Sequence, residues 1–330
     1  MLGVFVENAQ HFVVPPYAEL VARSGAGDHA ALWLIQVACE NKVYALFALL
    51  FGYGIALQMA RSGPRFVGLH LWRMGILFLI GVFHYAKLWT GDILATYALL
   101  GVMLLVFRAR SMRTLACAGM LALAAPTLAL TVATVMNEPA AATVAEIRYP
   151  ARQALVAFAM FLLGLAAGRT RGEAGDLVRV LRQHLPLLLA SGVVGSLAYV
   201  GLVDFSGASA VSGTAVLAEA LIAVAGPALA LAYAALVLHA LERPRWRRAL
   251  ARLAPAGRLS LTNYLAQSLI GVWVLARLGV IHPPAGIAIA CVVYALQVVA
   301  SGWWLAYFRF GPVEWLWRAL SYGKLPRLRA

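Results

Sequence analysis

The chain has 330 residues, of which 63% are hydrophobic and 12% are charged, and its mean hydropathy is +0.82. Soluble domains carry about 25% charged residues, so this sequence has too little polar surface to cover a water-soluble core. It is therefore predicted to be an integral membrane protein with lipid as its solvent. The formal net charge of +14 does not indicate nucleic-acid binding, because the basic residues stand in short clusters between apolar runs.

Apolar runs near the length of a bilayer span occur at ten places, and they predict an all-α, polytopic transmembrane helix bundle. The runs lie at 2–14, 42–60, 71–88, 92–107, 114–136, 152–168, 185–203, 215–240, 259–277 and 285–308. The whole chain, 1–330, is interpreted as one transmembrane domain with an interfacial tail over 309–330. The longest intervening stretch, 15–41, is expected to be a connection. Gly164/Gly168 and Gly192/Ser196 are small-xxx-small pairs that permit close helix contact.

The first apolar run is shorter than the roughly 20 residues that a span needs. No positive charge precedes it, so it is not a signal peptide. We expect the true first helix to begin upstream of Met1.

The distribution of the 27 Lys and Arg residues predicts the orientation of the bundle. Twenty-one of them follow the even-numbered spans or the C-terminal end. The alternate connections hold only Arg23, Lys42, Lys87, Arg148, Arg152 and Arg277. The positive-inside rule therefore places the C-terminus on the cytoplasmic side of a bacterial inner membrane.

The sequence contains no motif for metal binding or for the common chemistries of soluble enzymes. The three cysteines, Cys39, Cys117 and Cys291, have no CxxC or His/Cys metal spacing. They are interpreted as small buried apolar residues. The sequence contains no phosphate-binding Gly-rich Lys loop, HExxH, GxSxG or GxGxxG.

One group of polar residues is predicted near the outer face. His84 lies eleven residues after Arg73, which places it ~17 Å along the third span, and Asp92 opens the fourth. A histidine and a carboxylate on adjacent helix ends can pair, and this fixes the imidazole tautomer for proton transfer. Asn8 is expected to join them, as Glu40 and Asn41 can. The alternative is a structural His–Asp contact that ties two helices.

A second group is predicted at the cytoplasmic end of the last two spans. Ser260, Asn263 and Gln267 recur at helical spacing, which gives a polar stripe that must face the bundle interior. The segment 311–318 is amphipathic, with Glu314 and Arg318 spaced as an i,i+4 pair. The hypothesis is an anion site built from Arg73, Arg258 and Arg318; the alternative is an interfacial anchor.

Four blocks of the sequence, in this order, resemble the YeiB family of bacterial inner-membrane proteins, known as domain of unknown function 418. They are LFALLFGYGIAL (46–57), RMGILFLIGVFHYAKLWTGDILATYALLG (73–101), GRLSLTNYLAQS (257–268) and GPVEWLWRALSYG (311–323). MLGVFVENAQHF (1–12) resembles the tail of the family's first helix. The Asp and Arg-Gly block that usually precedes it is absent.

That family is distantly similar to transmembrane acyltransferases such as heparan-α-glucosaminide N-acetyltransferase. The resemblance implies transfer from cytosolic acyl-CoA, with acetyl-CoA the first expectation, to an unidentified acceptor through an intramembrane histidine. His84 would be the base or the acyl carrier, with Asp92 and Asn8 assisting it. Arg73, Arg258 and Arg318 would bind the donor phosphates, and Asn263, Gln267 and Glu314 would shape the pocket.

Two other function classes stay open at this stage. In a proton-coupled transporter of a small metabolite, His84 and Asp92 would be the coupling pair, although no internal repeat is found. A scaffold without chemistry would leave both polar groups unused. The expected partners are membrane lipid, acyl-CoA and the acceptor, with no nucleic acid and no metal. The oligomeric state is left open, a homo-oligomer included.

Overall fold

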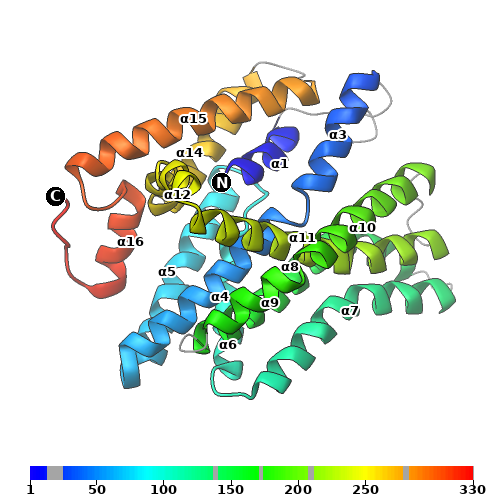
Figure 1. Ribbon diagram of the computed structural model, residues 1–330, viewed down its shortest axis with the longest axis horizontal. Helices are drawn as coiled ribbons and strands as arrows, with labels where there is room; N and C mark the ends of the chain where they lie inside the picture. The colour runs from blue at the N-terminus through cyan, green and yellow to red at the C-terminus, as the bar shows by residue number, and fades with distance from the viewer. Residues whose placement is uncertain (13–24, 137–139, 171–173, 207–211, 278–281, 330) are drawn as a thin grey trace. The chain divides into compact units, whose positions relative to one another are not determined.

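The computed structural model describes residues 1–12, 25–136, 140–170, 174–206, 212–277 and 282–329. Within these ranges the regular secondary structure is helical, and the one β-bridge joins Phe308 to Arg329. The predicted all-α class is confirmed. Each of the ten predicted apolar runs contains a helix (Figure 1): α1 (Leu2–Phe12), α4 (Val43–Ser62), α5 (Phe66–Lys87), α6 (Leu94–Phe107), α7 (Met112–Met136), α8 (Ala140–Arg169), α10 (Leu185–Ser206), α11 (Gly213–Glu242), α14 (Ser260–Trp273) and α15 (Pro283–Tyr307).

In the described part of the chain, four further α-helices lie between these ten and one follows them: α3 (Ala26–Ala38), α9 (Ala174–Gln183), α12 (Pro244–Ala251) and α13 (Ala254–Arg258), and after α15 the helix α16 (Pro312–Tyr322). The expectation that 15–41 is only a connection is therefore wrong. Helix α3 forms there because Ala31, Leu32 and Ile35 recur on one face, and all three are buried.

The outward-facing side chains are those of a membrane protein. Six stretches of the described chain are long and apolar enough to cross a bilayer; one of them, Ala26–Lys87, covers α3, α4 and α5. Large apolar side chains point outward from these helices, among them Leu79 (68% exposed), Val135 (78%) and Val299 (71%). Soluble proteins rarely expose extended apolar surfaces of this kind. The chain is a polytopic helical membrane protein.

The interpretation of all three cysteines as buried is wrong. Cys39 is half-buried, whereas Cys117 on α7 and Cys291 on α15 are exposed. Outside a soluble core a thiol needs no burial, because lipid solvates it as well as an apolar interior would.

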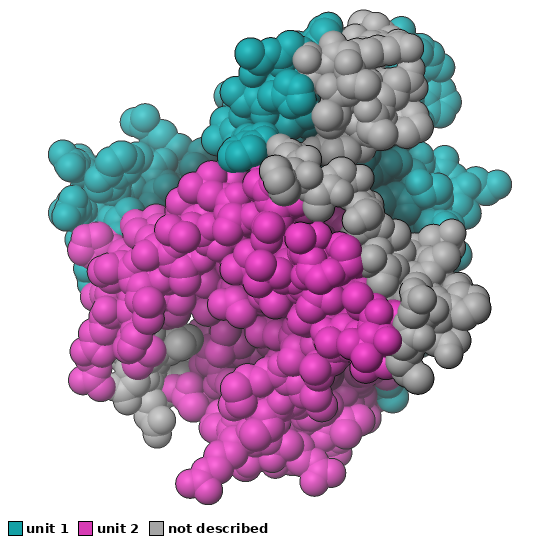
Figure 2. Space-filling model, turned by 90° about the vertical axis from the view of Figure 1, so that its right-hand side faces the viewer, with its two compact units in different colours: residues 1–35, 69–98, 240–330 teal, residues 36–68, 99–239 magenta. Residues whose placement is uncertain are grey.

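The chain divides into two compact units, each assembled from segments far apart in sequence (Figure 2). Unit 1 contains residues 1–35, 69–98 and 240–330, and unit 2 contains residues 36–68 and 99–239. In unit 1, α1 packs against α14 and α15. A Cβ at Gly271 of α14 would clash with the Phe12 ring, so glycine is what lets α1 approach so closely.

In unit 2, α8 packs against both α4 and α7. Added Cβ atoms at Gly164 and Gly168 would overlap α4, and one at Gly192 would overlap Leu229 of α11. The small-xxx-small pairs therefore do mark close helix contacts, as predicted. Phe161 and Leu165 on α8 are fully buried, and the Phe161 ring stacks on Phe51 of α4 with centroids 5.1 Å apart.

Candidate functional site

The His84 group lies in unit 1, where α5 ends and α6 begins. His84 is in the last turn of α5 and is fully buried. Its Nδ1 atom lies 2.9 Å from Oδ1 of Asp92, whose side chain is 1% exposed. The contact is short but not aligned with the ring N–H, so it is a close electrostatic pairing rather than a linear hydrogen bond. The structure thus brings these two predicted residues together.

Asp92 is itself held in place from the other side. Its Oδ2 accepts a hydrogen bond of 2.8 Å from the backbone N–H of Ala95, in the first turn of α6. This is the bond that an N-capping carboxylate makes. A Cβ at Gly81 would clash with Ala95 N and lie 2.9 Å from Asp92 Oδ2. Glycine at this position therefore lets α5 approach the start of α6 closely enough for the pairing.

The third member of this group is Ser268 on α14, which the sequence reasoning did not single out. Its Oγ lies 2.9 Å from His84 Nε2 and is buried. With a carboxylate facing Nδ1, the favoured tautomer carries its proton there, so Nε2 accepts a hydrogen bond from the serine hydroxyl. The order carboxylate, imidazole, hydroxyl is that of a hydrolase triad. Ser268 follows Gln267 on the predicted polar face, and extending the stripe by one residue would have found it.

Aromatic rings border His84. The Tyr264 ring centroid lies 5.3 Å from that of His84, and the Trp89 centroid lies 6.5 Å away, edge-on. Trp89 also contacts Phe12 of α1, with centroids 4.7 Å apart. Asn8, half-buried on the same helix, makes no hydrogen bond to His84 or Asp92 within the described part of the chain. The structure therefore shows no polar contact between Asn8 and the pair among the described residues.

The predicted polar stripe of α14 is buried against α15. Asn263 donates to the Ala256 carbonyl and to Ser301 Oγ, both at 3.1 Å. Gln267 donates to Gln297 Oε1 at 2.8 Å, and the Gln297 amide donates back to the Asn263 carbonyl. These bonds join two helices in an apolar medium, where interhelical hydrogen bonds replace absent water. Asn263 and Gln267 therefore serve the α14–α15 interface in this structure.

Glu314 binds the start of α14. Its carboxylate accepts hydrogen bonds from the backbone N–H groups of Leu261, at 2.7 Å, and Thr262, at 3.0 Å, and from the Thr262 hydroxyl. A carboxylate is favoured there because the first N–H groups of a helix lack partners and the helix dipole is positive at that end. The expected i,i+4 pairing with Arg318 is not formed; Arg318 instead lies over the Phe310 ring, 4.6 Å from its centroid.

The three predicted arginines gather around α16 and the turn before it. Arg258 donates to the Arg309 carbonyl at 3.2 Å, next to the Phe310 ring beneath Arg318. Arg73 donates to the Tyr322 hydroxyl at 2.7 Å and lies 4.3 Å from the centroid of Trp317. Arg73 and Arg318 are close enough to repel each other. Among the described residues none of the three has a carboxylate partner.

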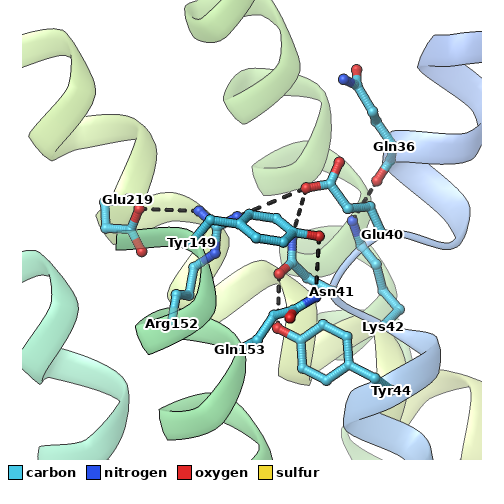
Figure 3. Close-up of polar contacts among 9 residues, drawn as sticks. All are labelled: Gln36, Glu40, Asn41, Lys42, Tyr44, Tyr149, Arg152, Gln153 and Glu219. Carbon is cyan, nitrogen blue, oxygen red and sulfur yellow. Dashed lines mark hydrogen bonds and ion pairs between the residues drawn. The ribbon is translucent and has the colours of Figure 1, made fainter. Parts of the chain in front are cut away.

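A second buried cluster, in unit 2, was not predicted as a group (Figure 3). Arg152 of α8 donates to Glu219 of α11 at 3.0 Å and lies 3.8 Å from Glu40. Asn41 donates to Glu40 and accepts from the Tyr44 hydroxyl. Glu40 and Asn41, which were considered as companions of His84, have these partners instead. Glu219 lies near the start of the predicted apolar run 215–240, and that isolated charge was the missed signal.

Residue Asn41 adopts a left-handed backbone conformation in this cluster, with φ of 63°. Such a conformation is uncommon for residues other than glycine, although asparagine tolerates it better than most. The turn is packed tightly: a Cβ on Gly226 of α11 would lie 3.2 Å from the Asn41 side chain. Lys42, fully buried, donates to the Gln36 carbonyl at 2.7 Å.

Comparison with known proteins identifies the family. Residues 173–324 match the family model described as "Protein of unknown function (DUF418)", and 97% of the chain aligns at 29% identity with 93% of "Uncharacterized protein YeiB" of Escherichia coli (strain K12). By these matches the chain is YeiB-like, with a DUF418 region over residues 173–324. The expected family is thereby confirmed.

Two further proteins similar to this chain also have names that state no function. "Uncharacterized protein YxaH" of Bacillus subtilis (strain 168) is 29% identical, with 98% of this chain and 91% of the relative aligned. "Uncharacterized 39.9 kDa protein in amylase 3'region" of Bacillus acidopullulyticus is 26% identical, over 86% and 81% respectively. No solved structure matches the chain.

Proposed function

We propose that the protein is an acyltransferase of a bacterial cytoplasmic membrane. It would take an acyl group from cytosolic acyl-CoA and deliver it to an acceptor hydroxyl or amine at or beyond the outer face. The observation that carries the proposal is the buried pair of His84 and Asp92, which holds a base next to a hydroxyl among apolar helices. A buried ionisable pair lowers the stability of a membrane helix bundle, so its presence favours a functional role.

His84 would move protons during the transfer. Acyl transfer requires a base that removes a proton from the attacking oxygen or nitrogen and an acid that returns it to the leaving group. With Asp92 at Nδ1, Nε2 is the nitrogen that can accept a proton, and the carboxylate stabilises the imidazolium that forms. The surrounding aromatic rings exclude water, which otherwise hydrolyses an activated acyl group.

The donor would bind at Arg73, Arg258 and Arg318. Arginine suits phosphate because its planar fork can donate two parallel charge-assisted hydrogen bonds. Glu314, the acid nearest in sequence to Arg318, is bound to the α14 N-terminus, and no described carboxylate neutralises the three guanidinium groups. An anionic ligand is the partner that such an unneutralised set favours. The rival source of negative charge is the lipid headgroup layer.

The test is a thermal-shift measurement on purified protein with acetyl-CoA. At a hundredfold excess over the dissociation constant, binding should stabilise the protein by about 2.7 kcal/mol. The double variant Arg258→Gln/Arg318→Gln should lose the shift, and His84→Ala should keep it while losing transfer of labelled acetyl. Added salt should weaken binding, because exposed phosphate contacts are screened over ~8–10 Å. An equal shift in wild type and double variant would disprove this donor site.

A proton-coupled transporter is the second candidate, and the Arg152 cluster favours it. Glu219 and Arg152 pair between membrane helices of unit 2, with side chains 2% and 4% exposed. Buried ionisable residues of this kind line ion and proton paths in transporters. Acidification-driven uptake into vesicles that is lost in Glu219→Gln, with no acyl transfer in wild type, would establish the transporter instead.

A further inference from the structure

We infer that Ser268 carries the acyl group as a covalent ester during transfer. The inference rests on the proposed acyltransferase function and adds a second reacting residue to it. Ser268 Oγ has two neighbours that can accept its proton: His84 Nε2 at 2.9 Å and the Tyr264 carbonyl at 3.4 Å. The histidine contact is the shorter by half an ångström, so the hydroxyl is directed at the base.

The order of the contacts from Asp92 through His84 to Ser268 supports a role for Ser268 as the nucleophile. A serine hydroxyl is a weak nucleophile until an adjacent base takes its proton and a third group orients that base. Here Asp92 faces Nδ1 of His84, and Ser268 faces Nε2. A serine present only to tie α14 to α5 would need the histidine but would not need a buried carboxylate on the opposite ring nitrogen.

The position of Ser268 along α14 also matches the donor site. The helix begins at Ser260, two residues after Arg258. Ser268 is eight residues further on, which at 1.5 Å per residue is ~12 Å. If the phosphates of acyl-CoA bind at the arginines, its thioester carbonyl must extend along this helix to reach Ser268 Oγ. The flexible pantetheine arm of coenzyme A covers such a distance.

The two half-reactions balance without any other reactant. Ser268 Oγ attacks the thioester carbonyl carbon, its proton passes to His84 Nε2, and the carbon–sulfur bond breaks. That proton then moves to the departing sulfur, which leaves as the coenzyme A thiol. The acceptor hydroxyl or amine next gives its proton to Nε2 and attacks the ester. The bond to Ser268 breaks, and the proton returns to Oγ.

Trapping the ester tests the inference. Purified wild type is incubated with labelled acetyl-CoA, and in a second arm with palmitoyl-CoA, without acceptor; released thiol and covalent label are then measured. We expect one thiol released and one acyl group bound per chain, mapped to Ser268 by mass spectrometry. Ser268→Ala and His84→Ala should lose the label. Ser268→Cys should form a thioester that neutral hydroxylamine cleaves, whereas the wild-type ester should resist it.

The control is Ser191→Ala on α10, where the hydroxyl donates only to backbone carbonyls of its own helix. It should keep wild-type labelling. A thermal shift with acyl-CoA but no label in wild type, or label that persists in Ser268→Ala, would overturn the covalent step and leave direct transfer. No shift and no thiol release with either acyl-CoA would remove the proposed function itself.

Discussion

His84 Nδ1 and Asp92 Oδ1 lie 2.9 Å apart, and the second oxygen of the same carboxylate is fixed by the backbone N–H of Ala95. One side chain thus begins helix α6 and orients the imidazole at the end of α5. The two tasks use different oxygens, so substitutions can separate them.

Asp92→Asn should impair catalysis more than folding. The amide oxygen can still accept from Ala95, but the charge that stabilises an imidazolium is lost, and general acid–base catalysis is worth about 10²–10⁴-fold. The rate of acyl transfer should decrease by a factor in that range, while the thermal midpoint changes little. Asp92→Ala should also lose the cap, at a cost of about 1 kcal/mol. Equal transfer rates in wild type and Asp92→Asn would contradict a functional role for the pair.

Gly81→Ala should disrupt the contact between α5 and α6. The new methyl group would overlap Ala95 N, and overpacking of this kind costs about 1–3 kcal/mol. Gly75→Ala is the matched control on the same helix, because a Cβ there meets nothing within 4 Å. Thermal unfolding in detergent should show a lower midpoint for Gly81→Ala alone. If both variants unfold alike, the close approach at Gly81 is not structurally important.

Removal of the Glu314 carboxylate should destabilise unit 1. Glu314→Ala leaves the partly buried N–H groups of Leu261 and Thr262 without their acceptor, and an unsatisfied donor costs up to about 1–3 kcal/mol when water cannot reach it. Glu314→Gln keeps one acceptor oxygen and should lose less. The thermal midpoints should follow the order wild type, Gln, Ala. A Gln variant as unstable as the Ala variant would show that the charge, and not the acceptor, is what matters.

The Arg152–Glu219 pair should show strong coupling. Removing one partner strands a buried charge and costs about 3–5 kcal/mol, whereas removing both costs less than the sum. The variants Arg152→Met, Glu219→Gln and the double variant form the cycle, read out by unfolding. Glu40, 3.8 Å from Arg152, should partly rescue Glu219→Gln. Additive effects would mean that the two side chains do not stabilise each other.

Single cysteines should report the predicted orientation, after Cys39, Cys117 and Cys291 are replaced by serine. Cysteines at Arg108, Arg247 and Arg327 should be shielded from an impermeant thiol reagent in intact cells, because positive loops stay in the cytoplasm. Those at Lys87, Thr90 and His282 should react. Permeabilised cells provide the control, since all six should then label. Labelling at Arg247 from outside would overturn the ten-span arrangement.

Sequence alone determined the helical class, the positions of helices in the ten apolar runs and several close contacts between helices. These properties follow from local composition: an apolar run of sufficient length must form a helix in lipid, because every backbone polar group has to be satisfied within its own segment. The glycine spacing at Gly164 and Gly168 predicted a close contact for the same local reason. The His84–Asp92 pairing was also predictable, because a short turn joins the two helix ends.

Partners from distant segments were decided only by the tertiary structure. Ser268 is 184 residues from His84, and Arg152 is 67 residues from Glu219, so no local pattern relates either pair. The same holds for Glu314, whose charge was assigned to Arg318 one turn away and instead binds the start of α14. A buried polar group forms a hydrogen bond with a partner that helix packing places beside it. Helix packing decides which partner lies beside a given polar group, and no single stretch of sequence encodes that packing.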